Sequence, residues 1–144
     1  MIQTEYPFTL PVGYLVAAAT ALAAPGDRIV LGPSTDGGYY LIGMKRPHPG
    51  LFEDIAWSTD QVFVQTLARA EALGLSVFEL PTWYDVDDAE TLQILIREVL
   101  DDKPFRTVGT PTPATWTRRH LSTLNGESRL QERIRGSRAA AELP

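Results

Sequence analysis

Apolar residues along the chain follow two periods, one typical of helices and one typical of strands. Leu15, Ala18 and Leu22 recur at helical spacing before a Pro-Gly pair that stops a helix. By contrast, 29–31 is a short continuous apolar run of the kind that is buried on both faces of a sheet. The same criteria predict helices at 12–23, 60–73 and 88–100, a further short helix at 115–124, and strands at 29–31, 39–44 and 75–80. This alternating order predicts an α/β fold in which a glycine turn joins the first two strands.

Composition narrows the class of protein. The 144 residues include no cysteine, which excludes disulfide frameworks, thiolate metal sites and cysteine nucleophiles. No run approaches the roughly 18 apolar residues that span a bilayer, and Glu5 stands where a signal peptide carries Lys or Arg. We therefore expect a cytoplasmic protein with no membrane partner.

Charge is divided unevenly along the chain. Residues 1–102 hold 5 Lys and Arg against 15 Asp and Glu, whereas residues 103–144 hold 8 against 3. An acidic body makes a nucleic-acid partner unexpected, and it suits a site that gathers a divalent cation. The basic residues near the C-terminus are expected to form the solvent-exposed face of a helix or to contact the acidic body.

A pair of glycines marks the first candidate site. Gly37 and Gly38 lie between the two β-type runs, with Asp36 before them and Tyr39 after them. Glycine permits positive φ and allows a ligand to approach the main chain closely. The segment predicts either a plain hairpin turn or a ligand-binding bend, and the local sequence leaves both open. It is not a P-loop, because no Lys-Ser or Lys-Thr follows the glycines.

A cluster of acids marks the second candidate site, at the junction between strand 75–80 and helix 88–100. Asp85, Asp87 and Asp88 repel one another unless a cation or the helix N-terminus neutralises them. Alternation in an extended chain puts Asp85 and Asp87 on one side, and Mg²⁺ takes hard oxygen ligands of this type. The alternative is that Asp87 or Asp88 caps the helix, and the spacing alone leaves both open.

The segment Trp57, Ser58 and Thr59 is the third candidate. It could place an aromatic edge and two hydroxyls over a pocket, but the local pattern favours Ser58 or Thr59 as the cap of helix 60–73.

Taken together, three ordered motifs resemble a known family. They are VLGPSTDGGYYLIG at 30–43, LFEDIAWSTD at 51–60 and YDVD at 84–87 before a helix. In this order they resemble the radical-SAM/selenodomain-associated transferase 1 family, which is similar to the nucleotide-diphospho-sugar transferases of the GT-A-like fold. The match runs from about residue 9 to 124, and 113–121 resembles the closing helix of the family.

The resemblance implies a role for each candidate residue. The catalytic residues would be Asp36 and Asp87, and the metal ligands would be Asp87 with Asp85. The acceptor side of the cleft would be lined by Gly37, Gly38, Tyr39, Trp57, Ser58 and Thr59. The implied reaction is Mg²⁺- or Mn²⁺-dependent glycosyl or nucleotidyl transfer from a nucleotide sugar or nucleoside triphosphate to an unknown acceptor.

The resemblance also implies an organisation of the chain. Residues 1–102 would form the acceptor-side half of a GT-A-like three-layer sandwich with a mixed sheet, 103–125 a linker and closing helix, and 126–144 a basic, flexible tail. The nucleotide-binding half that begins family members is expected to be absent, so the chain alone is expected to be inactive. The alternative is a non-catalytic remnant or interaction module, or a homo-oligomer, that pairs through an open sheet edge.

Overall fold

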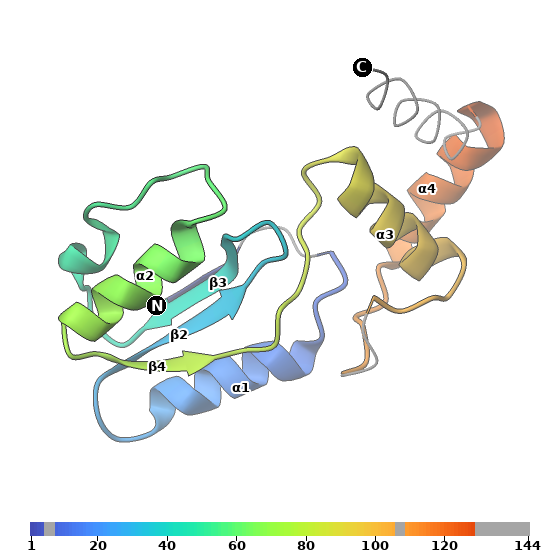
Figure 1. Cartoon of the computed structure of the whole chain (residues 1–144). Helices are drawn as coiled ribbons and strands as arrows, with labels where there is room; N and C mark the ends of the chain where they lie inside the picture. Colours follow the sequence, from blue (N-terminus) through green and yellow to red (C-terminus); the bar gives the residue numbers. More distant parts are fainter. Residues whose placement is uncertain (5–7, 106–108, 129–144) are drawn as a thin grey trace, which may run out of the picture.

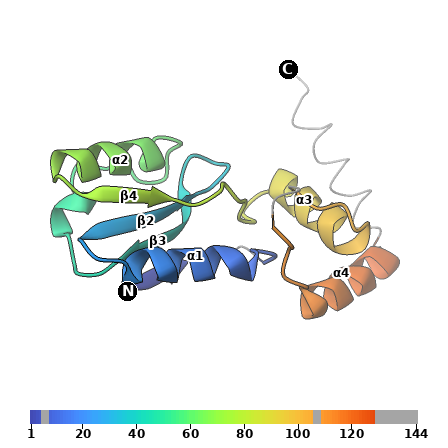
Figure 2. The same ribbon diagram turned by 90° about the horizontal axis from the view of Figure 1, so that it is seen from below.

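The fold is a three-layer arrangement around a four-stranded sheet (Figures 1 and 2). The computed structural model describes residues 1–4, 8–105 and 109–128. In sheet order, the strands are β1 (Ile2–Thr4), β3 (Tyr39–Met44), β2 (Arg28–Pro33) and β4 (Ser76–Glu79). β3 is antiparallel to β1 and β2, whereas β4 is parallel to β2. The expected α/β fold with a mixed sheet is therefore confirmed.

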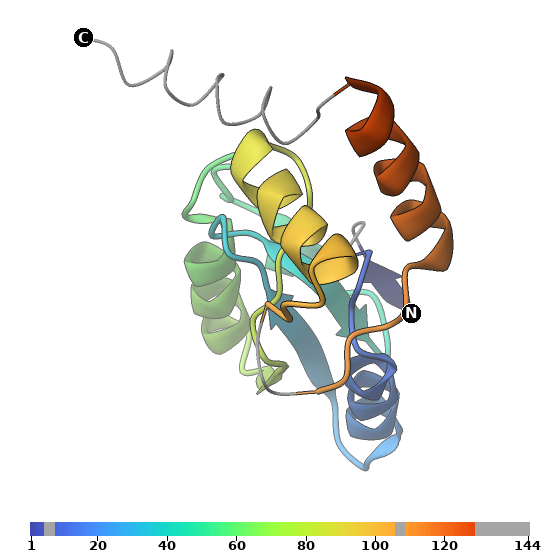
Figure 3. The ribbon, with the colours of Figure 1, turned by 90° about the vertical axis from the view of Figure 1, so that its right-hand side faces the viewer.

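Helices cover both faces and one end of the sheet. They are α1 (Val12–Ala23), the 3-10 helix η1 (Pro49–Phe52), α2 (Val62–Ala72), α3 (Ala89–Leu100) and α4 (Thr115–Ser128). α2 lies over one face and α1 over the other, as Figure 2 shows. α3 and α4 lie beyond the carboxyl ends of β2 and β4, and Figure 3 looks onto that end. Within the described residues, no helix combines the length and the apolar character needed to cross a bilayer.

Most of the predicted elements form close to their predicted bounds. α1 and β3 match, and the other predicted helices and strands shift by a few residues at their ends. β1 was missed because three residues are too few to show a period-two pattern. α4 runs four residues beyond the predicted helix and reaches Ser128, whereas 129–144 of the predicted tail lies outside the described residues.

Alternation along β2 divides the core between the two faces of the sheet. Ile29 and Leu31 pack with Leu51 and Ala70 on the α2 side, whereas Val30 packs with α1 on the other side. All of these side chains are fully buried. The continuous apolar run at 29–31 therefore reflects burial on both faces, as the sequence predicted.

A carboxylate buried between α3 and the rest of the molecule joins distant segments. Glu98 accepts hydrogen bonds from the hydroxyl of Thr9, from the Tyr84 hydroxyl at 2.6 Å and from the Phe105 backbone N–H at 3.1 Å. These bonds hold α3 against the chain just before the acidic junction, because Tyr84 immediately precedes Asp85. Burial of the phenol and its bond to Glu98 raise the pKa of Tyr84 above its usual range.

We expect replacement of Glu98 by Ala to lower the free energy of unfolding by about 3 kcal/mol, because it removes the acceptor of two buried hydroxyls and one part-buried N–H. The measurement is urea unfolding, with the exposed Glu71→Ala on α2 as the charge-loss control. Equal losses in the two variants would show that the buried bonds contribute nothing.

Candidate functional site

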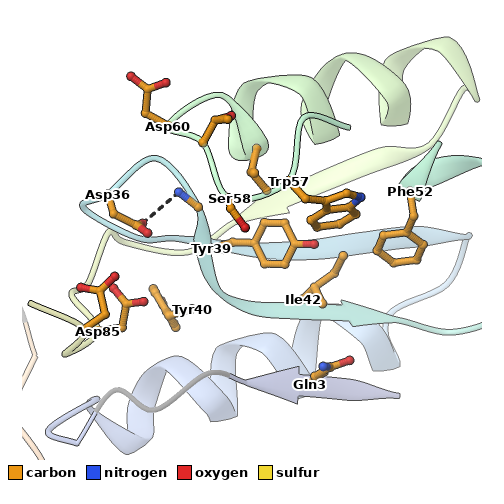
Figure 4. Close-up of a pocket in the computed structure, with 14 residues that line it drawn as sticks. Gln3, Asp36, Tyr39, Tyr40, Ile42, Phe52, Trp57, Ser58, Asp60 and Asp85 are labelled. Carbon is orange, nitrogen blue, oxygen red and sulfur yellow. Dashed lines mark hydrogen bonds between the residues drawn. The ribbon is translucent and has the colours of Figure 1, made fainter. Parts of the chain in front are cut away.

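A cavity of about 660 Å³ opens between three segments (Figure 4). They are the glycine bend at 36–38, the acidic junction at 85–88 and the loop that precedes α2. It takes in almost every residue that the sequence singled out. The predicted residues that line it are Asp36, Gly38, Tyr39, Trp57, Ser58, Thr59, Asp85 and Asp87. The structure thus brings together three segments that are separated by up to about fifty positions in the chain.

Three of the predicted carboxylates meet at one end of this cavity. One oxygen each from Asp36, Asp85 and Asp87 lies within 4.8 Å of the others. Asp36 and Asp87 are exposed, and Asp85 is half-buried. Hereafter these three residues are called the acid triad.

The pairing of β2 with β4 brings the acid triad together. The parallel strands are extended by a bridge between Ser34 and Trp83, in which the Trp83 N–H donates to the Pro33 carbonyl at 3.0 Å. Asp36 and Asp85 each lie two residues beyond a partner of this bridge. Carboxyl ends of parallel strands meet at the same edge of a sheet, and residues that follow them face a common crevice.

Local hydrogen bonds orient two of the carboxylates. The Ser34 hydroxyl donates to Oδ1 of Asp85 at 2.6 Å. The backbone N–H of Gly38 donates to Oδ1 of Asp36 at 2.9 Å, which closes a turn of the kind that Asp favours. Each of these carboxylates is therefore held by one oxygen.

Asp87 is the member of the acid triad whose ionised form is disfavoured by its surroundings. Partial desolvation raises its pKa above the ordinary carboxyl value, and the charge of Asp85 raises it further. Asp88 and Asp36 contribute in the same direction. The donor set is three carboxylates whose mutual repulsion a cation would relieve, and such a set suits Mg²⁺ or Mn²⁺.

Asp88 has a different role from its two acidic neighbours. It is the N-cap of α3, where its side chain accepts from the Thr91 N–H at 2.7 Å within a reciprocal capping box. These bonds to Thr91 lower the pKa of Asp88 below the ordinary value. The capping interpretation of the acidic junction is therefore confirmed for Asp88, whereas Asp85 and Asp87 line the cavity and their role as metal ligands stays a prediction.

Gly37 does not line the cavity. Its φ is +90°, and a Cβ at this position would lie 2.2 Å from the backbone oxygen of Asp60. Its carbonyl accepts from the Phe63 N–H at 2.8 Å. Gly37 therefore packs the glycine bend directly against the start of α2. Its role in the structure is this close packing, and it is not part of the cavity wall as expected.

The prediction that Ser58 or Thr59 caps α2 is wrong. The N-cap of α2 is Gln61, and its side chain makes no capping hydrogen bond to the helix. The Thr59 hydroxyl instead accepts from the Gln61 N–H at 3.2 Å and donates to the Ala56 carbonyl at 2.7 Å. This hydroxyl closes the turn before the helix, so the turn and not the helix end uses it.

Six residues that line the cavity were not predicted. They are Gln3, Tyr40, Ile42, Phe52, Asp60 and Val62. Asp60 could have been found, because it ends the motif that contains Trp57. Gln3 could not, because nothing in three residues of strand sequence indicates that β1 pairs with β3 beside this cavity.

Comparisons with known proteins agree with the fold. A profile of the family described as "Uncharacterized protein conserved in bacteria (DUF2064)" matches residues 3–59. The chain is also similar to a solved structure from Desulfovibrio desulfuricans described as a "putative nucleotide-diphospho-sugar transferase", with a TM-score of 0.65 and 27% sequence identity. The similarity covers 85% of this chain and 52% of that one, so the chain spans about half the length of this solved relative. No curated protein matches the chain.

The comparisons define a class rather than a particular protein. The fold is similar to that of the structure described as a "putative nucleotide-diphospho-sugar transferase", over the part that the two chains share. The narrower resemblance to the radical-SAM/selenodomain-associated transferase 1 family stays a prediction.

Proposed function

We propose that residues 1–102 form the acceptor-side, metal-holding part of a transferase that uses a nucleotide sugar or a nucleoside triphosphate. The observation that carries the proposal is the meeting of Asp36, Asp85 and Asp87 at one end of a cavity large enough for a small molecule. The likeness to a solved structure described as a "putative nucleotide-diphospho-sugar transferase" supports the same class of reaction.

In this proposal Asp85 and Asp87 hold Mg²⁺ or Mn²⁺. When bound, the ion supplies charge that neutralises phosphate oxygens and positions the donor. Ser34 orients Asp85 through the 2.6 Å hydrogen bond. Asp36, held by the Gly38 N–H, would accept a hydrogen bond from the acceptor hydroxyl.

The negative charge of the cavity lining means that the proposed cation is needed for a phosphate-bearing donor to bind. Among the described residues that line the cavity, four are Asp and none is Lys, Arg or His. These residues alone would therefore repel a pyrophosphate. Both glycosyl and nucleotidyl transfer place negative oxygens beside the ion, so the proposal includes both.

Titration calorimetry tests this function. We expect Mg²⁺ or Mn²⁺ to bind with measurable heat and Asp85→Asn to abolish that heat. Any further heat that UDP-glucose, UTP or GTP adds in the presence of the cation should disappear in the same variant. Glu71→Gln, which removes one exposed charge from α2, is the control and should bind like the unchanged protein. Absence of heat at millimolar ligand would contradict the proposal for this chain.

A second candidate function is an interaction module, and α1 favours it. Residues 8–24 contain no charged side chain, and Val12 and Val16 on α1 are 59% and 58% exposed. Within the described residues, β1 and β4 each pair with a strand on one side only. An uncharged helix with exposed apolar side chains and a sheet with open edges are both surfaces on which another polypeptide could dock.

If this surface joins two copies, light scattering after gel filtration should give the mass of a dimer at micromolar concentration. Val16→Glu should then give a monomer, because it places a charge in the apolar interface. Val64→Glu on α2, where Val64 is 53% exposed, is the matched control and should stay dimeric. A monomer at all concentrations would reject this homo-oligomer.

A further inference from the structure

The end of the cavity that faces away from the acid triad is aromatic. Phe52 and Trp57 stack with ring centroids 6.4 Å apart and planes inclined at 27°. Figure 4 shows the two rings side by side, with the Tyr39 ring between them and Asp36. Hereafter Phe52 and Trp57 are called the aromatic wall.

The aromatic wall leaves large apolar surfaces unburied inside a cavity. Trp57 is 52% exposed and Phe52 is 37% exposed, although each lies beside the other. Both line the cavity, so these exposed ring surfaces adjoin space that a ligand can enter. A flat ligand ring stacked there would bury them, and offset stacking adds to the gain from burial.

The charge of the cavity limits what such a ligand can carry. Its described lining includes Asp36, Asp60, Asp85 and Asp87 and no cationic residue. Without a bound cation, a carboxylate or phosphate on the ring-bearing ligand would meet uncompensated negative charge. A neutral ligand meets no such repulsion, and an amine is attracted to both the carboxylates and the ring faces.

We propose that the aromatic wall selects the acceptor, which is a neutral or cationic molecule with a flat apolar ring face and a hydroxyl group. The ring stacks on Trp57 and Phe52, and the hydroxyl points along the cavity toward Asp36. That the bound molecule is the acceptor of the reaction rests on the proposed transferase function. The ring site itself is independent of metal and donor.

Two kinds of molecule present a flat apolar face, namely aromatic rings and the apolar face of a sugar. The test therefore uses matched probes in saturation-transfer NMR, without metal or nucleotide. Tyrosol, tyramine and 4-hydroxyphenylacetate share one phenol ring and differ in the end group, which is an alcohol, an amine or a carboxylate. Methyl β-glucoside represents the sugar face.

We expect tyramine and tyrosol to bind with millimolar Kd, and 4-hydroxyphenylacetate at least about tenfold more weakly. Binding of the glucoside in place of the phenols would assign the site to sugars. Equal binding of all three phenols, or no binding of any probe, would overturn the proposal.

Variants show whether the aromatic wall holds the probe. Trp57→Ala and Phe52→Ala should each weaken binding by about fivefold to tenfold, whereas Trp57→Phe keeps a ring and should retain most of it. Trp116→Ala on α4, where Trp116 is 79% exposed, is the matched control and should change nothing. Trp57→Ala binding as tightly as the unchanged protein would overturn the proposal.

The result separates this inference from the proposed function. Ring binding without any metal or donor binding would leave the ring site and reject the transferase. Metal and donor binding without ring binding would leave the transferase and reject the ring site.

Discussion

Replacing Gly37 by Ala is expected to lower the free energy of unfolding by about 4 kcal/mol. Two costs combine, because a side chain at φ +90° is strained and the new Cβ would lie 2.2 Å from the Asp60 carbonyl oxygen. The glycine bend and the start of α2 must then separate, which also displaces Asp36 from the acid triad. Urea unfolding measures the loss.

Gly74→Ala is the matched control for this experiment. Gly74 also has a positive φ, of +66°, but a Cβ there would meet nothing within 4 Å. We expect a loss of about 1 kcal/mol, since only backbone strain is added. A loss at Gly37 no larger than the loss at Gly74 would show that the close contact with Asp60 does not matter for stability.

Replacing Asp87 by Asn is expected to change stability in opposite directions with and without metal. Without metal the variant should be more stable by up to about 1 kcal/mol, because the repulsion from Asp85 and Asp36 is removed. The gain is this small because solvent screens much of that repulsion. With Mg²⁺ or Mn²⁺ in excess, the unchanged protein should gain stability through binding, and the variant should not.

Thermal unfolding with and without the cation measures both effects, and calorimetry should show metal affinity reduced on the order of 100-fold. Asp88→Asn is the control, because Asn also caps helices and Asp88 is outside the acid triad. Equal stabilisation of both variants by the cation would place the metal elsewhere.

The pH dependence of these effects follows from the pKa directions. The raised pKa of Asp87 means that its contribution to stability is fully present below the unfolded pKa and is lost as pH rises through the folded pKa. Metal binding needs the ionised carboxyl, so the affinity should fall as pH drops toward that raised pKa. The lowered pKa of Asp88 has the opposite sign, and its contribution is lost as pH falls.

Most helices and strands of the fold were predictable, because their signals are local. α1 has apolar residues at helical spacing and a Pro-Gly stop, and both signals lie within a few residues of the helix. The N-cap at Asp88 was likewise among the alternatives that the sequence offered. β1 and the end of α4 were not, since a three-residue strand and a weakly patterned helix carry little local information.

By itself, the amino-acid sequence determined the α/β alternation, the glycine bend and the supply of carboxylates at 85–88. Only the tertiary structure decided that Asp36 joins Asp85 and Asp87, that Gly37 packs on Asp60, and that Phe52 stacks on Trp57. The physical reason is that a helix or strand depends on residues next to one another in the chain. The site depends instead on the parallel pairing of β2 with β4 and the docking of α2, which the shared core sets.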